Sequence, residues 1–175
     1  MRRPSSLDID RESFRVVVTC LVYRIRQGDV LPGDVRFLVL KRNPELAIFP
    51  GLWTVPGGGV RLGDLSSRML KASDAVEGVL ECAIRREIAE ECGREVCLGK
   101  ISYRSNFAFI QPNGVPVIGM RFSAPYLYGK VELDLSESTK SKWVTFEEAR
   151  TINFIAGVPE VLEQCATQLV QNHDR

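Results

Sequence analysis

The sequence predicts an α/β protein in which helices cover both faces of a mixed β-sheet, an α/β/α sandwich. Two groups of apolar, strand-like runs each lead into a helical pattern, and turn residues separate the strands inside each group. Helices that follow strands in this order pack against the two faces of one sheet. With 175 residues, of which 45% are apolar, the chain can bury one core. We expect residues 14–175 to form a single domain, preceded by a flexible segment at 1–13.

The first group begins with two predicted strands at residues 14–25 and 35–42, which are rich in Val, Leu and Phe. The stretch between them, Q-G-D-V-L-P-G-D, has turn chemistry, so the two strands should form a hairpin. A short strand is expected at 53–55. A helix is expected at 79–92, where an apolar residue recurs at every fourth position and would pack on the sheet.

The second group predicts strands at residues 96–111 and 115–128, because the intervening P-N-G is a strong hairpin signal. A further strand should begin at residues 143–144. The closing element is an amphipathic helix at 158–171, with Pro159 in its first turn, where proline is tolerated.

Composition and charge exclude several classes of protein. The formal net charge is +1 and no long basic stripe occurs, so capture of a nucleic-acid backbone is not expected. The N-terminal arginine pair is followed by no apolar stretch, and no run is long enough to cross a bilayer. The five cysteines show no metal-ligand spacing. We therefore expect a cytoplasmic protein with no membrane partner.

The predicted helix at 79–92 carries a group of carboxylates on one face. In R-E-I-A-E-E-C-G, which begins at Arg86, helical spacing places Glu87, Glu90 and Glu91 within a single turn. Ligands that are all oxygen suit a hard cation such as Mg²⁺ or Mn²⁺. The alternative is a solvated, salt-bridged face, because Arg86 and Arg94 stand four residues to either side of Glu90.

A glycine-rich turn, W-T-V-P-G-G-G-V-R-L-G-D, precedes this helix in the sequence. Together the two segments resemble the Nudix box of the Nudix hydrolases, a Gly, five residues, a Glu, seven residues, and then R-E-U-x-E-E-x-G-U with U aliphatic. Gly58 stands at the opening Gly and Asp64 at the first acidic position. Two departures occur: the spacer is twenty-one residues long, because about 65–78 is inserted, and Arg94 replaces the last aliphatic residue.

The resemblance implies a role for each box residue. Glu87, Glu90 and Glu91 would bind the metal, which is Mg²⁺ or Mn²⁺ in this family, and Glu90 would also be catalytic. Arg86 would orient the neighbouring glutamates through ion pairs. The role of the first acidic residue is open between Asp64 and two glutamates nearer the helix, Glu77 and Glu81.

A second family-like segment, W-V-T-F-E-E-A, starts at Trp143 and resembles the strand and short helix near the end of the Nudix fold. Thr145 and Glu148 form a capping box, which starts the helix. Counting back from Trp143, Glu137 lies in the loop where some members carry a further glutamate that acts as metal ligand or general base. The alternative is an ordinary loop carboxylate. The only histidine, His173, is the third residue from the end of the chain, which leaves a carboxylate or metal-bound hydroxide to activate water.

The resemblance implies hydrolysis of a diphosphate linkage in a nucleoside diphosphate joined to another moiety. Two alternatives stay open, a housecleaning pyrophosphohydrolase of nucleoside triphosphates and a Nudix-like domain that binds a nucleotide without hydrolysis. The expected partner is a small nucleotide derivative.

Two further features bear on substrate and assembly. Alternation along the predicted strand would place Tyr103, Phe107 and Phe109 on one side as a platform for the base, or as ordinary core residues. The platform would belong, with Gly58, to the substrate-binding residues. The inserted segment at 65–78 is either a lid, a contact of a homodimer, or a solvated loop.

Overall fold

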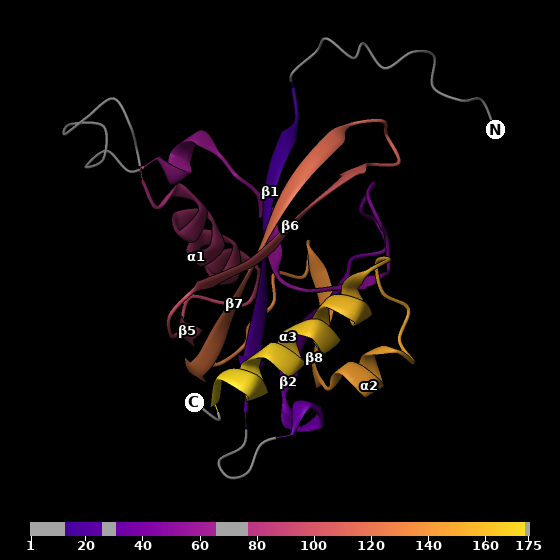
Figure 1. The fold of residues 1–175 in the computed structure, drawn as a ribbon. Helices are drawn as coiled ribbons and strands as arrows, with labels where there is room; N and C mark the ends of the chain where they lie inside the picture. The colour runs from indigo at the N-terminus through magenta and orange to yellow at the C-terminus, as the bar shows by residue number, and fades with distance from the viewer. Residues whose placement is uncertain (1–12, 26–30, 66–76, 174–175) are drawn as a thin grey trace.

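The computed structural model describes residues 13–25, 31–65 and 77–173. It confirms the predicted α/β sandwich with a mixed sheet (Figure 1). The elements in chain order are β1 (Arg15–Arg24), η1 (Pro32–Asp34), β2 (Arg36–Arg42), β3 (Trp53–Thr54), β4 (Gly57–Gly59), η2 (Leu62–Asp64), α1 (Val79–Glu91), β5 (Cys97–Leu98), β6 (Ser102–Ile110), β7 (Pro116–Tyr128), β8 (Ser138–Val144), α2 (Phe146–Ala149) and α3 (Val158–His173).

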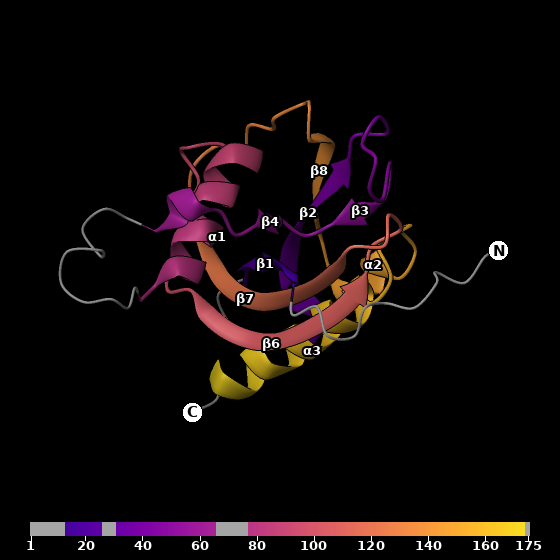
Figure 2. The same cartoon turned by 90° about the horizontal axis from the view of Figure 1, so that it is seen from above.

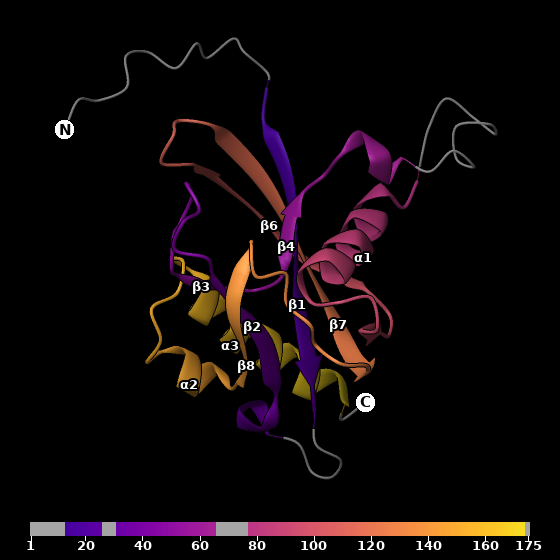
Figure 3. The ribbon, with the colours of Figure 1, turned by 180° about the vertical axis from the view of Figure 1, so that it is seen from behind.

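Strand β1 is the centre of the sheet and has different partners at its two ends. Along most of its length it pairs in parallel with β7. On its other side, Tyr23 and Arg24 pair antiparallel with β2, whereas Val17 to Thr19 pair antiparallel with β4. Strand β2 continues to β3 and β8, and β6 pairs with β7. The sheet therefore divides at β1, and β4 runs along its upper end next to α1 (Figure 3).

The two faces of the sheet bury two apolar clusters. Alternate residues of β1 and β2, such as Val18 and Leu38, pack under α1 with Ile84 and Ile88. The intervening residues, such as Phe37, pack with α3 and α2. Seen from above, α1 and α3 lie on opposite sides of the strands (Figure 2). This is the period-two pattern of a sheet that is covered on both faces.

Two predicted strands differ from the structure, and one observed strand was missed. The run 96–111 is two strands, because the register against β7 shifts between Cys97 and Leu98 and the chain then leaves the sheet for three residues. Residues 143–144 end β8 instead of beginning a strand, because β8 pairs with β2 along its whole length. Strand β4 consists of three glycines and was not predicted, because glycine has a low strand propensity.

Other predictions are confirmed or fall outside the described residues. The helix start at Thr145 has the predicted capping box, in which Glu148 N–H donates to Thr145 Oγ1 over 3.2 Å. Residues 1–12 of the flexible segment predicted at 1–13, and residues 66–76 of the insertion predicted at about 65–78, lie outside the described residues. Within the described part of the chain, no helix is long and apolar enough to cross a membrane.

Candidate active site

The acidic face of α1 is fixed by the packing of its opposite face. Ala83, Ile84 and Ile88 are fully or almost fully buried against the sheet. This turns Glu87 and Glu91 toward β4, where both are also buried, while the Glu90 side chain stays 43% exposed at the rim. The helix therefore presents two buried carboxylates and one accessible carboxylate to the same edge of the sheet.

Arg86 is held by Asp64 from η2. Arg86 Nε and Nη2 donate to the two carboxylate oxygens of Asp64 over 2.7 and 3.0 Å, and Nη2 also donates to the Gly59 carbonyl over 2.8 Å. The Arg86 guanidinium keeps the pKa of buried Asp64 below its usual range. Of the three candidates for the first acidic position, Asp64 is therefore the one that binds Arg86. Glu77 and Glu81 are exposed, and neither makes an ion pair with another described residue.

Two arginines bind the glutamates of α1 directly. Arg86 Nη1 lies 2.7 Å from Glu87 Oε1 and 3.0 Å from Glu90 Oε2. Arg61, from the loop after β4, lies 3.1 Å from Glu90 Oε1 and 4.0 Å from Glu87 Oε1. Arg86 therefore forms the ion pair with Glu90 that the alternative interpretation of this helix face predicted. Arg94 is exposed and makes no ion pair with Glu90 or any other described residue.

Glu91 is buried where its negative charge is costly. Gly57 N–H donates to Glu91 Oε2 over 2.8 Å, which favours the ionised form. Desolvation by burial outweighs this and, with the nearby charges of Glu87 and Glu137, raises the pKa of Glu91 to about 8 from an ordinary 4.5. Burial also raises the pKa of Glu87. The two carboxylates therefore resist being charged together in the absence of a cation.

The glycines of β4 allow the carboxylates to approach the backbone. A Cβ atom on Gly58 would lie 2.5 Å from Glu87 Oε1, so only glycine leaves room for the Glu87 carboxylate. Gly57 has φ +150°, and a Cβ atom there would lie 2.2 Å from the Val18 carbonyl oxygen. The structure thus places Gly58 against a predicted metal ligand.

Glu137 reaches this site through the loop before β8. The Asn43 N–H donates to the Glu137 carbonyl over 2.8 Å, and the next residue, Ser138, pairs with Arg42 at the end of β2. The charge of Glu137 raises the pKa of Glu91 and that of Arg42 lowers it. The loop glutamate therefore lies within electrostatic reach of Glu91.

The side chains are not arranged as a finished metal site. Among the described residues, no three His, Cys, Asp or Glu side chains converge closely enough to hold a metal ion. The physical reason is that Arg86 and Arg61 bind Glu87 and Glu90, while Glu91 turns to the Gly57 N–H. The donors are nevertheless all carboxylate oxygens on one helical turn, which is a set that fits Mg²⁺ or Mn²⁺.

The prediction that the three aromatic residues lie on one side of the strand is wrong for Tyr103. Arg104 is an extra residue in β6, because Tyr103 pairs with Phe122 whereas Ser105 pairs with Arg121. This bulge reverses the alternation, so Tyr103 lies on the α1 side of the sheet, where it packs edge-on against the Phe122 ring at 5.7 Å. Phe107 and Phe109 stay together on the other side, with ring centroids 6.0 Å apart.

Sequence reasoning missed Arg61, Arg42 and Gly57 as parts of this site. The contacts of Arg61 and Gly57 follow from the pairing of β4 with β1, and a strand of three glycines gives no strand signal. Arg42 ends a predicted strand, but its neighbour Glu137 is 95 residues away in the chain. Only tertiary packing brings these groups together.

Comparison with known proteins agrees with this geometry. The family model described as the NUDIX domain matches residues 13–165. The chain belongs to the Nudix hydrolase family. Nudix proteins generally use divalent metal ions. The residues of the Nudix box therefore lie on β4, η2 and α1, with Gly93 just after α1, around the carboxylates and arginines described above.

Among curated Nudix relatives, nucleoside triphosphatase NudI of Escherichia coli K12 is 32% identical over 73 residues, and that of Escherichia fergusonii is 33% identical. The match covers 42% of this chain and 42% of each relative. The chain thus spans less than half the length of these proteins.

Solved structures share the Nudix fold over almost the whole chain. The MutT NUDIX hydrolase of Burkholderia pseudomallei has a TM-score of 0.63 at 23% identity, covering 87% of this chain and 98% of that one. The NUDIX domain of Shewanella oneidensis NrtR, in complex with ADP ribose, has a TM-score of 0.66 at 15% identity, covering 93% and 92%.

Proposed function

We propose that this protein is a divalent-metal-dependent hydrolase that cleaves a diphosphate linkage in a nucleoside diphosphate joined to another moiety. The observation that carries the proposal is the buried glutamate pair of α1, which faces Gly57 and Gly58 and has raised pKa values. A buried pair of carboxylates is destabilising unless a cation or a proton neutralises it.

The local charge supports one divalent cation. Five carboxylates and three guanidinium groups interact in the described part of the site, which leaves an excess of two negative charges when all are ionised. The carboxylates are Asp64, Glu87, Glu90, Glu91 and Glu137, and the guanidinium groups are Arg42, Arg61 and Arg86. A polyphosphate adds further negative charge, so the site would bind such a substrate only together with a cation.

Each side chain has a distinct role in this proposal. Glu87, Glu90 and Glu91 would hold Mg²⁺ or Mn²⁺, which when bound neutralises phosphate charge and lowers the pKa of water. Arg86, anchored by Asp64, is a positioning residue for Glu87 and Glu90. Glu137, whose charge acts on Glu91, would accept the proton of the attacking water, because the one histidine, His173, lies far along the chain from the box.

A second candidate is a pyrophosphohydrolase of nucleoside triphosphates. The curated relatives named nucleoside triphosphatase favour it, whereas the NrtR complex with ADP ribose favours the linked diphosphate. The same carboxylates would serve either reaction. The cytoplasmic location and a homodimer contact through residues 65–78 stay predictions from the sequence.

The test is a substrate panel with the purified chain and Mg²⁺ or Mn²⁺. It should contain linked nucleoside diphosphates and nucleoside triphosphates, with products separated by chromatography. Two phosphate monoesters from a linked diphosphate would support the first candidate, and pyrophosphate from a triphosphate would support the second. Tight nucleotide binding with no product from any substrate would instead favour a binding domain without hydrolysis.

A further inference from the structure

A cavity lies between the last turns of α1 and the strands β5 and β7 (Figure 1). Its volume is about 390 Å³, which is within the range of small-molecule sites. Arg85 of α1 lines this cavity, and Glu87 follows it by two residues, which correspond to about 200° around a helix axis. The cavity and the carboxylates are therefore on opposite sides of α1.

Arg94 also lines the cavity, and it is the residue at which the chain departs from the last aliphatic position of the Nudix box. Gly93, whose φ is +101°, follows the end of α1, and the Val96 N–H donates to the Gly93 carbonyl over 3.2 Å. This turn brings Arg94 and Glu95 to the cavity. An aliphatic side chain would only add apolar surface there, whereas arginine adds a planar cation with five N–H donors.

The charges around the cavity are not balanced. Neither Arg85 nor Arg94 makes an ion pair with another residue in the described part of the chain, and both are exposed. Among the described residues that line the cavity, Glu95 is the one carboxylate. Two guanidinium groups and one carboxylate leave an excess of one positive charge, which a bound monoanion would neutralise.

The remaining walls of the cavity are apolar and aromatic. Ile88 and Leu98 are buried in the apolar cluster under α1, and Val96 packs against it. Tyr128 stands opposite Cys97 in the pairing of β5 with β7 and is 66% exposed beside the cavity. Its ring offers a face to a planar ligand, and its hydroxyl offers a donor. Apolar surface and two cations therefore border one hollow.

We propose that this cavity binds an aromatic monocarboxylate, with its carboxylate on Arg85 and Arg94 and its ring between the apolar wall and Tyr128. A guanidinium matches a carboxylate through two parallel N–H···O bonds. A single negative charge balances the local excess, whereas a phosphate dianion would leave a net negative charge beside Glu95. The inference is independent of the proposed hydrolysis, because none of the α1 carboxylates lines the cavity.

The test measures binding of β-naphthoate by calorimetry, with β-naphthylmethanol as the uncharged match. A chelator removes divalent ions, so the excess of carboxylates in the Nudix box repels the same anion. The unaltered chain should bind the acid about 10-fold or more tightly than the alcohol, because only the acid can pair with the arginines. Arg85→Gln and Arg94→Leu should each lower the affinity for β-naphthoate about 5-fold or more.

Cysteine alkylation locates the bound anion. Cys97 lines the cavity, whereas Cys82 of α1, which is also partly exposed, does not. β-Naphthoate at about 10 times its dissociation constant should slow the reaction of Cys97 with iodoacetamide about 5-fold or more. The reaction of Cys82 should keep its rate. Mass spectrometry of the digested protein measures both rates in one sample.

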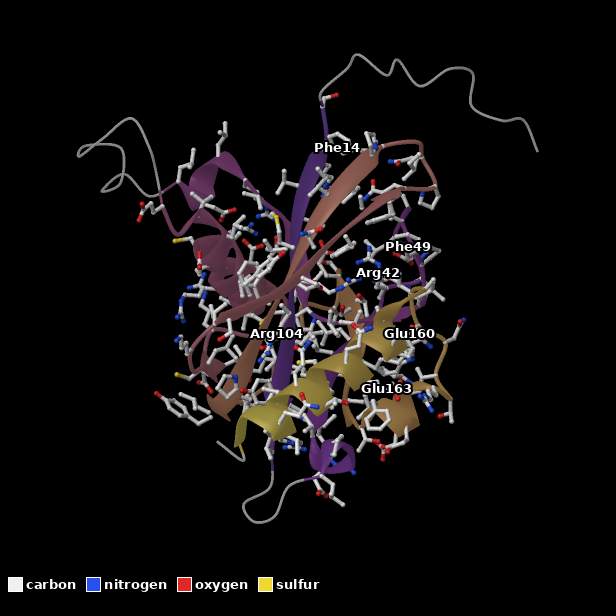
Figure 4. All side chains as sticks on the ribbon, in the orientation of Figure 1. Phe14, Arg42, Phe49, Arg104, Glu160 and Glu163 are labelled. Atoms are coloured by element: carbon white, nitrogen blue, oxygen red, sulfur yellow. The ribbon has the colours of Figure 1, made fainter. Side chains whose placement is uncertain are left out.

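The control for charge is Arg150→Gln. Arg150 is exposed, and its Nη2 lies 2.7 Å from the carboxylate of Glu163, which is on α3, across the sheet from α1 (Figure 4). This variant should keep its affinity for β-naphthoate, and an equal loss in Arg150→Gln and Arg85→Gln would overturn the inference. Equal binding of acid and alcohol, displacement of β-naphthoate by an equal concentration of inorganic phosphate, or an unprotected Cys97 would also overturn it.

Discussion

At the level of single residues, Glu91 shows how burial and function are linked. Its carboxylate is almost completely buried, beside Glu87, with the Gly57 N–H as its hydrogen-bond donor. One hydrogen bond does not offset the cost of desolvating a charge, so the pKa rises to about 8. In metal-free protein near neutral pH, Glu91 therefore holds a proton that a bound cation would have to displace.

This shift predicts a pH-dependent stability. Between pH 4.5 and about 8 the folded protein keeps the Glu91 proton that the unfolded chain has lost. The stability contributed by this proton is complete below pH 4.5 and is lost as the pH rises to about 8. Urea unfolding in a chelating buffer should show this decline, at most about 1.4 kcal/mol per pH unit. Glu91→Gln should be flatter over the same range, and identical slopes in the two proteins would contradict the shift.

Glu90 provides a test of the metal role with little risk to the fold. Its side chain is 43% exposed and its partners are Arg61 and Arg86, so its ion pairs should contribute less than about 1 kcal/mol to stability. Glu90→Gln should lower kcat about 100-fold or more while the unfolding midpoint changes little, because it removes a charged ligand and keeps the shape. Glu81→Gln, an exposed change on the same helix, is the control and should keep full activity. Full activity in Glu90→Gln would refute the assignment.

Sequence alone could identify the residues whose relative positions follow from the spacing within one helix or strand. Helical spacing was sufficient to group Glu87, Glu90 and Glu91, because they lie within one turn of α1. Spacing could not show that Arg61 and Arg86 would bind the same carboxylates, since the approach of Arg61 depends on where β4 pairs. The three metal ligands remain predictions, because their side chains do not converge on one point.

At the level of elements, two glycines of β4 are required for different reasons, one by the backbone and one by a carboxylate. Alanine substitutions at these two positions and at a control glycine should therefore have three different effects. Gly57→Ala forces a Cβ atom to 2.2 Å from backbone at φ +150°, so it should destabilise the fold by about 2 kcal/mol or more. Gly58→Ala meets only the flexible end of Glu87, so stability should change by less than about 1 kcal/mol while turnover falls about 10-fold, because Glu87 must move. Gly63→Ala, with no atom within 4 Å, should change neither property. Chemical denaturation and initial rates on the three variants would separate these effects, and equal losses in all three would contradict the argument.

The elements that sequence reasoning placed correctly have a strong period or a capping signal. Helix α1 was predicted within one residue of its observed end, and α3 starts at the predicted Val158. One error occurs where a strand interrupts its own pattern. The bulge at Arg104 reverses the side of Tyr103, and nothing in the residue types of β6 marks it, because its cause is the register against β7.

At the level of the whole molecule, overall charge gives no sign of the site. The chain has a net charge of +1, yet the box and the loop of Glu137 gather an excess of two carboxylates over guanidinium groups among the described residues. Charges that are distant in sequence balance this local excess elsewhere on the surface. The excess is therefore a property of the fold, and a cation that binds it should stabilise the folded state as a whole.

This stabilisation is measurable by thermal unfolding. A divalent ion at about 100 times its dissociation constant should add roughly 2.7 kcal/mol, which for a chain of this size raises Tm by about 5 to 10 °C. Mn²⁺ and Mg²⁺ should both act, and NaCl at equal ionic strength should not, since screening cannot neutralise a buried pair. The rise should be smaller at pH 6 than at pH 8, because the ion must displace the Glu91 proton. The triple variant Glu87→Gln, Glu90→Gln, Glu91→Gln should lose the response, and an undiminished rise in that variant would place the cation elsewhere on the protein.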